Sequence, residues 1–309
     1  MKRLYELDAI RSACFIWIVA VWHLNSYLMP SLHYSGYVLD IFHNITSAAL
    51  GMFAFLSGTL LSKYEFRNER DIGNFYKKRL SKFFFLLLIS AVSYKIVGWI
   101  STGQVVQIVT GTNLFIGPSV PTLWFFSMMV FLYIVTPLLS WSFSNNHQKH
   151  FQVMMTILIL CIILASAYFL EIDRRLAYYY PMYVIGLFVG SERLIKVVHS
   201  NFLYFSFPLI ILLFLGKINP FVAEIAGGSF FLLCGNLAFQ QTNSLCRVVS
   251  VASMIAYLFH RQFFSLIIRA FEHQGIAYIP LGVAIVAFIV LVIICYYIQT
   301  MIDNLKRDI

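Results

Sequence analysis

The sequence has very little charge. Asp, Glu, Lys and Arg together make up only 11% of its 309 residues, whereas a soluble globular domain carries about 25%. So few charged residues cannot cover a water-exposed surface, which excludes a large soluble domain. Instead, 60% of the residues are hydrophobic. They form successive runs of about 17 to 23 residues, each long enough to cross ~30 Å of hydrocarbon.

Paired cysteines are also missing. The five cysteines have no CxxC or regular spacing, and they lie in or at the ends of apolar runs: Cys14, Cys161, Cys234, Cys246 and Cys295. This pattern argues against a disulfide framework and against a zinc site. We interpret the cysteines as small apolar fillers, and we expect no metal centre.

The apolar runs predict an all-α integral membrane protein, a polytopic bundle of about ten transmembrane helices in a single domain, residues 1–309. Because two of the runs are short and contain Pro and Gly, we expect kinks or re-entrant pieces near Pro181, Gly186, Gly190 and Pro208. The expected spans are Ile10–Leu28, Val38–Leu61, Phe83–Ile100, Thr122–Trp141, Phe151–Leu170, Tyr178–Gly190, Phe202–Leu215, Phe221–Phe239, Val248–Ile268 and Pro280–Ile302.

The positive charges indicate the orientation. The net charge is +9, and with these spans fifteen of the 22 Lys and Arg residues fall on the side of the amino terminus. Only Arg174, Arg175 and Lys217 fall on the opposite side. The positive-inside rule therefore predicts that both termini are cytoplasmic. The excess of positive charge is explained by topology, so we expect no nucleic-acid partner.

Two ionisable residues lie in the first expected span. A charged side chain in the hydrocarbon costs at least ~2.5 kcal/mol, so each needs a partner, a cavity or a function. Arg11 and His23 are twelve residues apart, about 18 Å along a helix axis. Arg11 lies near the cytoplasmic end and His23 toward the external third. The structural alternatives are snorkelling for Arg11 and an interhelical hydrogen bond for His23.

Three further residues share the external half with His23. Glu224 lies near the start of the eighth span, and His260 with Arg261 lies about thirteen residues into the ninth, so all three are at a depth comparable with His23. They are candidates to line one cavity. The alternative is a structural ion pair between Glu224 and Arg261.

On the cytoplasmic side, three cations lie within about one turn at the start of the third span. Lys78, Arg79 and Lys82 can together hold a polyphosphate. The alternative is that the cluster only fixes the topology and attracts anionic lipid.

Five short motifs, in this order, make the chain similar to the membrane-bound acyltransferase-3 family over nearly all of its length. They are Leu7-Asp8-Ala-Ile-Arg11 leading to His23, Phe53-Ala-Phe-Leu-Ser57-Gly58-Thr-Leu-Leu61, Lys78-Arg79-Leu-Ser-Lys82, Leu123-Trp124-Phe125 and Tyr257-Leu-Phe-His260.

The resemblance implies a membrane-bound O-acyltransferase of the bacterial inner membrane. Such an enzyme moves an acyl group, usually acetyl from acetyl-CoA, to a hydroxyl of a cell-surface or lipid-linked glycan. The CoA ester is then a donor substrate rather than a permanently bound cofactor, and the other partners are the saccharide acceptor and membrane lipid.

The roles follow from the chemistry of acyl transfer. The acceptor hydroxyl needs a general base, and histidine is the side chain whose ordinary pKa lies nearest to working pH. We therefore expect His23 and Arg11 to be catalytic. The phosphates of CoA are expected on Lys78, Arg79 and Lys82. The residues expected to line the substrate are Glu224, His260, Arg261, Ser57 and Trp124, although Ser57 and Trp124 also suit close packing.

Two other functions fit a polytopic bundle. One is a carrier or flippase for a lipid-linked sugar or anion, with the external polar cavity as its transport site. The other is a membrane scaffold without catalysis. The sequence shows no internal repeat, which weakens the carrier reading because many carriers have two related halves.

One spacing departs from the family pattern. Eleven residues separate Arg11 from His23, where the family usually has ten, and on a regular α-helix this rotates His23 by roughly 120°. A π-bulge would absorb the extra residue. Without one, Arg11 and His23 do not share a helix face.

Overall fold

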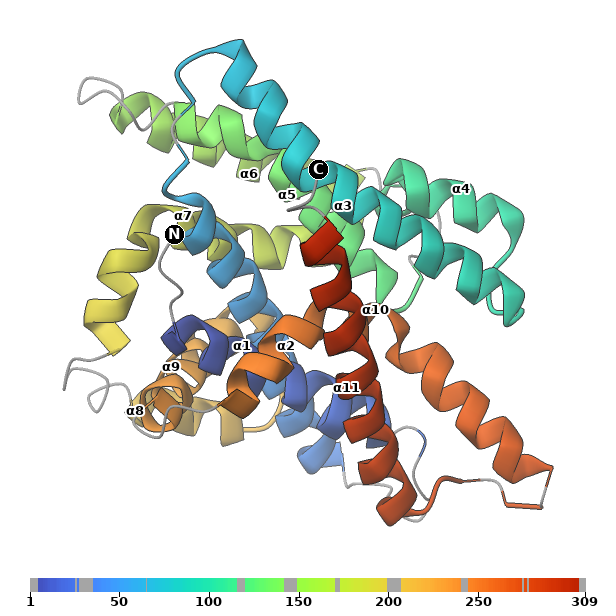
Figure 1. Cartoon of the computed structure of the whole chain (residues 1–309). Coiled ribbons are helices and arrows are strands. Elements are labelled where there is room, and N and C mark those ends of the chain that lie inside the picture. The colour runs from blue at the N-terminus through green and yellow to red at the C-terminus, as the bar shows by residue number, and fades with distance from the viewer. Residues whose placement is uncertain are drawn as a thin grey trace. The chain divides into compact units, whose positions relative to one another are not determined.

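The computed structural model describes residues 5–25, 27, 36–64, 66–115, 120–141, 149–169, 173–198, 207–239, 244–273, 275–276 and 278–305. Within these ranges the chain consists of helices joined by short turns and connections, without a strand (Figure 1). The elements are α1 (Tyr5–Ile16), η1 (Trp17–His23), α2 (Gly36–Leu61), α3 (Glu69–Ile96), α4 (Thr102–Thr110), η3 (Thr112–Leu114), α5 (Leu123–Trp141), α6 (Lys149–Phe169), α7 (Arg175–Val198), α8 (Phe207–Ile211), η6 (Leu212–Phe214), α9 (Pro220–Phe239), α10 (Ser244–Glu272) and α11 (Leu281–Leu305).

The helices form two compact units. The first unit consists of Met1–Phe53 and Ile195–Ile309, and the second of Ala54–Leu194. In the first unit, α1 packs on α9 and α10, and α10 packs on α11. In the second unit, α3 packs on α4 and α5, and α3 and α4 lie side by side in Figure 1.

Four of the described helices are long and apolar enough to cross a membrane: Gly36–Leu61, Leu123–Ser140, Ser244–Glu272 and Leu281–Asn304. Shorter apolar helices cover Met154–Ser166 and Pro220–Leu233. The all-helical membrane fold is therefore confirmed, whereas ten spans and the cytoplasmic position of the termini stay predictions. In the described part of the expected seventh span, α-helix covers only Phe207–Ile211.

One element was missed by the hydropathy pattern. The nine-residue helix α4 follows the third expected span. Its sequence signal is a capping box, in which the Ser101 side chain accepts from the Gln104 amide while the Gln104 side chain accepts from the Ser101 amide. Gly111, at φ 75°, ends the helix in the left-handed conformation that favours glycine.

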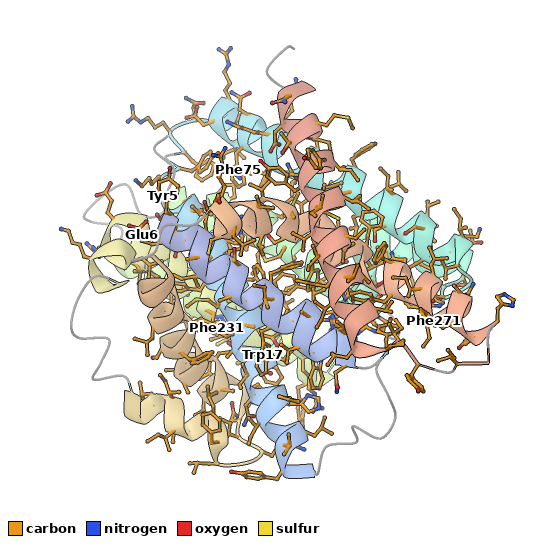
Figure 2. The ribbon with its side chains drawn as sticks, turned by 60° about the horizontal axis from the view of Figure 1, so that its bottom comes forward. Tyr5, Glu6, Trp17, Phe75, Phe231 and Phe271 are labelled. Carbon is orange, nitrogen blue, oxygen red and sulfur yellow. The ribbon has the colours of Figure 1, made fainter. Side chains whose placement is uncertain are left out.

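The first helix changes its winding halfway. It is α-helical to Ile16 and then π-helical from Trp17 to His23. This confirms that a π-bulge lies between Arg11 and His23. Trp17, labelled in Figure 2, stands where the winding changes. Its indole N–H donates to Thr46 Oγ1 of α2 at 3.1 Å, which anchors this point of the helix.

Two glycines bring α2 and α7 into backbone contact in the second unit. A Cβ on Gly58 would lie 2.1 Å from the carbonyl oxygen of Tyr183, and a Cβ on Gly186 would lie 2.1 Å from that of Phe55. Only glycine fits at such a crossing. Gly186 therefore packs two helices together, and the expected kink occurs at Gly190, whose φ of 67° and ψ of 162° interrupt α7.

Candidate functional site

Two histidines from α10 and the π-helix meet in the first unit. His23 Nδ1 lies 2.6 Å from His260 Nε2. The rings are inclined by only 7°, with centroids 4.6 Å apart. Because stacked rings cannot approach closer than about 3.5 Å, the short distance between nitrogens means that the rings meet edge to edge. Both side chains are buried, His260 completely and His23 at 8% exposure.

The protons of this pair are fixed by a backbone carbonyl. His260 Nδ1 lies 2.7 Å from the carbonyl oxygen of Tyr257, one turn earlier in α10. A carbonyl oxygen only accepts, so Nδ1 of His260 carries the proton and neutral His260 has its lone pair on Nε2. That lone pair accepts the proton of His23 Nδ1. The remaining nitrogen of His23, Nε2, is then the one with a free lone pair, which is the form that a general base needs.

A second layer of contacts surrounds the pair. Arg261 donates a hydrogen bond to the hydroxyl of Tyr27, and the Tyr27 carbonyl accepts from the Ile279 amide at 3.0 Å. Phe264 lies edge-on to His260 at 6.3 Å and close to the Tyr27 ring at 5.7 Å. Arg261 is thus linked to a residue four positions beyond His23.

Glu224 is completely buried in α9. Neither carboxyl oxygen has a hydrogen-bond partner, so an ion pair between Glu224 and Arg261, the structural alternative raised by the sequence, is not formed. The side chain is packed against α2, since a Cβ on Gly51 would lie 2.8 Å from Glu224 Cγ. Its predicted role in substrate binding stays a prediction.

The middle of α1 is joined to α10 by hydroxyl groups. Ser250 Oγ donates to Asp8 Oδ1 at 2.6 Å, and Ser12 Oγ donates to the Cys246 carbonyl at 2.8 Å. Arg11 lies half-buried between these two contacts along α1. Asp8 of the opening motif therefore belongs to the surface on which α1 meets α10, the helix that carries His260.

Helix α3 carries the three predicted phosphate-binding cations. Arg79 donates to the Tyr64 hydroxyl at 3.0 Å and lies over the Tyr64 ring at 5.3 Å. Lys78 is exposed. The side chain of Lys82 lies outside the described part of the chain. Binding of phosphate by these three residues stays a prediction, but the contacts of Arg79 point toward a different group of residues.

That group surrounds a cavity of about 390 Å³ in the second unit. The cavity lies where α2 ends and where α7 is interrupted at Gly190. Its polar lining residues are Ser62, Lys63, Tyr64, Ser140, Glu192 and Arg193. Lys63 and Glu192 form an exposed ion pair at 3.3 Å. Sequence reasoning missed this site because its residues come from the ends of three expected spans and share no motif.

Comparison with known proteins agrees with the motifs. The acyltransferase-3 family model, described as an acyltransferase domain, matches residues 4–300. The chain belongs to the acyltransferase-3 family. It is therefore an acyltransferase, and with its apolar helices it is a membrane protein. No curated protein and no solved structure matches it.

The two remaining acyltransferase-3 motifs lie in packed surroundings. Trp124 is only 6% exposed, with the Arg175 guanidinium 4.0 Å over its ring and Tyr179 stacked at 5.7 Å. Asp173 pairs with Arg175 through both carboxylate oxygens and holds the guanidinium in place. Ser57 is half-buried next to the glycine crossing of α2 and α7. Substrate binding by Trp124 and Ser57 stays a prediction.

Proposed function

We propose that this acyltransferase moves an acetyl group from acetyl-CoA to a hydroxyl of a cell-surface or lipid-linked glycan, with His23 as the general base. The observation that carries the proposal is the hydrogen-bonded series from the Tyr257 carbonyl through His260 to His23. It leaves a lone pair on His23 Nε2 without requiring a charged partner. Such a base suits proton removal from a neutral hydroxyl.

The reaction then proceeds in two steps. As the acceptor oxygen attacks the thioester carbonyl, the hydroxyl proton passes to His23 Nε2 and a tetrahedral intermediate forms. When the intermediate collapses, the carbon–sulfur bond breaks and His23 returns the proton to the departing sulfur. His260 does not touch the reacting atoms and is a positioning residue. Arg11 lies twelve residues earlier in the same helix, too far from His23 to touch the same carbonyl oxygen, and remains a candidate to bind the donor away from the reacting atoms.

The acceptor and the cellular location follow from the family resemblance rather than from the coordinates. We propose a bacterial inner-membrane enzyme with both termini in the cytoplasm. Glu224, Arg261, Ser57 and Trp124 remain candidates to line the acceptor path. Among them, Arg261 has the strongest support because it follows His260 directly and binds Tyr27 close to His23.

The test is acetyl transfer by the purified protein in lipid nanodiscs, with glycan products identified by mass spectrometry. The His23→Ala protein should insert normally and bind acetyl-CoA like the wild type, yet transfer acetyl groups roughly 10²- to 10⁴-fold more slowly, the usual contribution of a general base. Full transfer by a correctly inserted His23→Ala protein would remove His23 from the mechanism. Movement of a lipid-linked sugar without acetyl transfer would favour a carrier.

A further inference from the structure

The cavity at the end of α2 has the composition of an anion site. We propose that it binds the phosphate groups of a nucleotide-type ligand. This inference rests on the proposed function, in which that ligand is the CoA portion of the acyl donor. Its volume of about 390 Å³ lies within the roughly 300 to 1,000 Å³ of small-molecule sites. The space is therefore large enough for a phosphorylated head group.

Two cations line the cavity directly. Arg193 is exposed there and has no ion-pair partner among the described residues. Lys63 pairs with Glu192, but the Glu192 side chain is 82% exposed, and such exposed pairs contribute little stability. A phosphate group can compete for Lys63, because charge-assisted hydrogen bonds to phosphate are about twice as strong as neutral ones.

A third cation acts through Tyr64. Arg79 donates to the Tyr64 hydroxyl oxygen, which leaves the hydroxyl's own proton available for an acceptor in the cavity. The Arg79 Nε is itself buried without a hydrogen-bond partner. A guanidinium held behind a hydroxyl polarises that hydroxyl as a donor. Arg79 of the α3 cluster is thus connected to this cavity through Tyr64.

The lining of the cavity includes Gly190, where α7 is interrupted. Gly190 has a positive φ of 67°, a conformation that side chains with a Cβ rarely adopt. A Cβ at this position would lie 3.1 Å from Ser62 Oγ. The absent side chain keeps the Ser62 oxygen uncovered, but the Ser62 proton is donated to the Thr59 carbonyl at 2.7 Å. The lining also holds the hydroxyls of Tyr64 and Ser140. The cavity thus combines cations with two hydroxyl donors, which are the groups that phosphate oxygens accept from.

The proposal is tested by titrating CoA and adenosine 3′,5′-bisphosphate into the full-length protein in nanodiscs of phosphatidylcholine alone. Arg193→Ala should weaken bisphosphate binding about tenfold through the loss of one charge-assisted contact. Glu192→Gln should tighten it severalfold, because it frees Lys63 and removes an opposing charge. Lys196→Ala, the same loss of charge one turn further along α7, is the matched control and should change Kd less than twofold.

Tyr64→Phe is a gentler second variant. It removes only the hydroxyl and keeps the ring that packs edge-on against Phe75. We expect Kd for the bisphosphate to rise between about threefold and tenfold, the effect of one neutral hydrogen bond. This variant keeps the test valid if a charge change at the cavity reduces the yield of folded protein.

Three results would overturn the inference. If CoA binds but Arg193→Ala, Glu192→Gln and Tyr64→Phe all bind as the wild type does, the donor binds elsewhere and the proposed function stands. If the variants differ only in nanodiscs with anionic lipid and the bisphosphate does not compete, the occupant is a lipid head group. If the wild type neither binds CoA nor transfers acetyl groups, the proposed function fails together with the site.

Discussion

His260 offers the sharpest test of the proposed base. We predict that His260→Leu lowers kcat while leaving KM for the donor nearly unchanged, and that His260→Gln largely restores kcat. Leucine fills much of the same buried space but cannot accept from His23 Nδ1. Glutamine has an amide oxygen that can accept that proton.

The size of the loss follows from the change of charge on His23. When His23 takes the acceptor's proton it becomes a cation, and its Nδ1–H bond to His260, 2.6 Å long in the resting protein, becomes a hydrogen bond from a charged donor. Such bonds contribute about 1.5 to 3 kcal/mol. Losing one in the transition state slows the reaction roughly 10- to 100-fold. The Gln variant should stay within about fivefold of the wild type.

Initial rates of acetyl transfer give kcat and KM, and thermal unfolding in the same nanodiscs reports folding. A structural defect would lower the unfolding temperature and affect Leu and Gln variants alike. The reasoning would be refuted if the folded Leu variant kept kcat within twofold of the wild type. Equal loss of kcat in both variants at unchanged stability would also refute the acceptor role.

Two further predictions concern the helices. Gly186→Ala forces a methyl group to within 2.1 Å of a backbone oxygen and should cost about 1 to 3 kcal/mol of stability, seen as a lower unfolding temperature. Gly73 has open space around it, so Gly73→Ala should stabilise the protein slightly. Equal changes of unfolding temperature in Gly186→Ala and Gly73→Ala would contradict the close crossing of α2 and α7. Deleting Ala20 from the π-helix should leave acetyl transfer within about tenfold, because the π-turn absorbs one residue. Deleting Leu56 from the α-helix α2 should abolish acetyl transfer. An equal loss of acetyl transfer in the two deletion variants would contradict the argument that the π-turn absorbs one residue.

The sequence raised a π-bulge as one of two alternatives for the helix that carries His23. Eleven residues separate Arg11 from His23, one more than the family pattern has. A π-bulge accommodates one extra residue without ending the helix. The structure has it at Trp17–His23. Four positions were expected to mark kinks or re-entrant pieces, and among them Gly190 is where the described part of α7 is interrupted. Local backbone geometry was predictable because it depends on residues that are close in sequence.

Contacts between distant residues were predicted only in part. Depth along the helices placed His23 and His260 at one level, but depth does not say which helices are neighbours, so their direct contact came from the structure. The contact of Arg79 with Tyr64 was missed for a related reason. Neighbouring helical residues point about 100° apart, and the partner that decides the direction of Arg79, Tyr64, belongs to another segment.

The hydrogen-bonded series that leads through His260 to His23 starts at a main-chain atom, the carbonyl oxygen of Tyr257. The oxygen that fixes the proton on His260 belongs to the peptide unit of Tyr257, so every residue type at position 257 provides it. Ordinary point mutation therefore cannot delete this acceptor. It is lost only if α10 itself bends or unwinds. The position of the proton on the base is therefore set by the geometry of one helical turn, from 257 to 260.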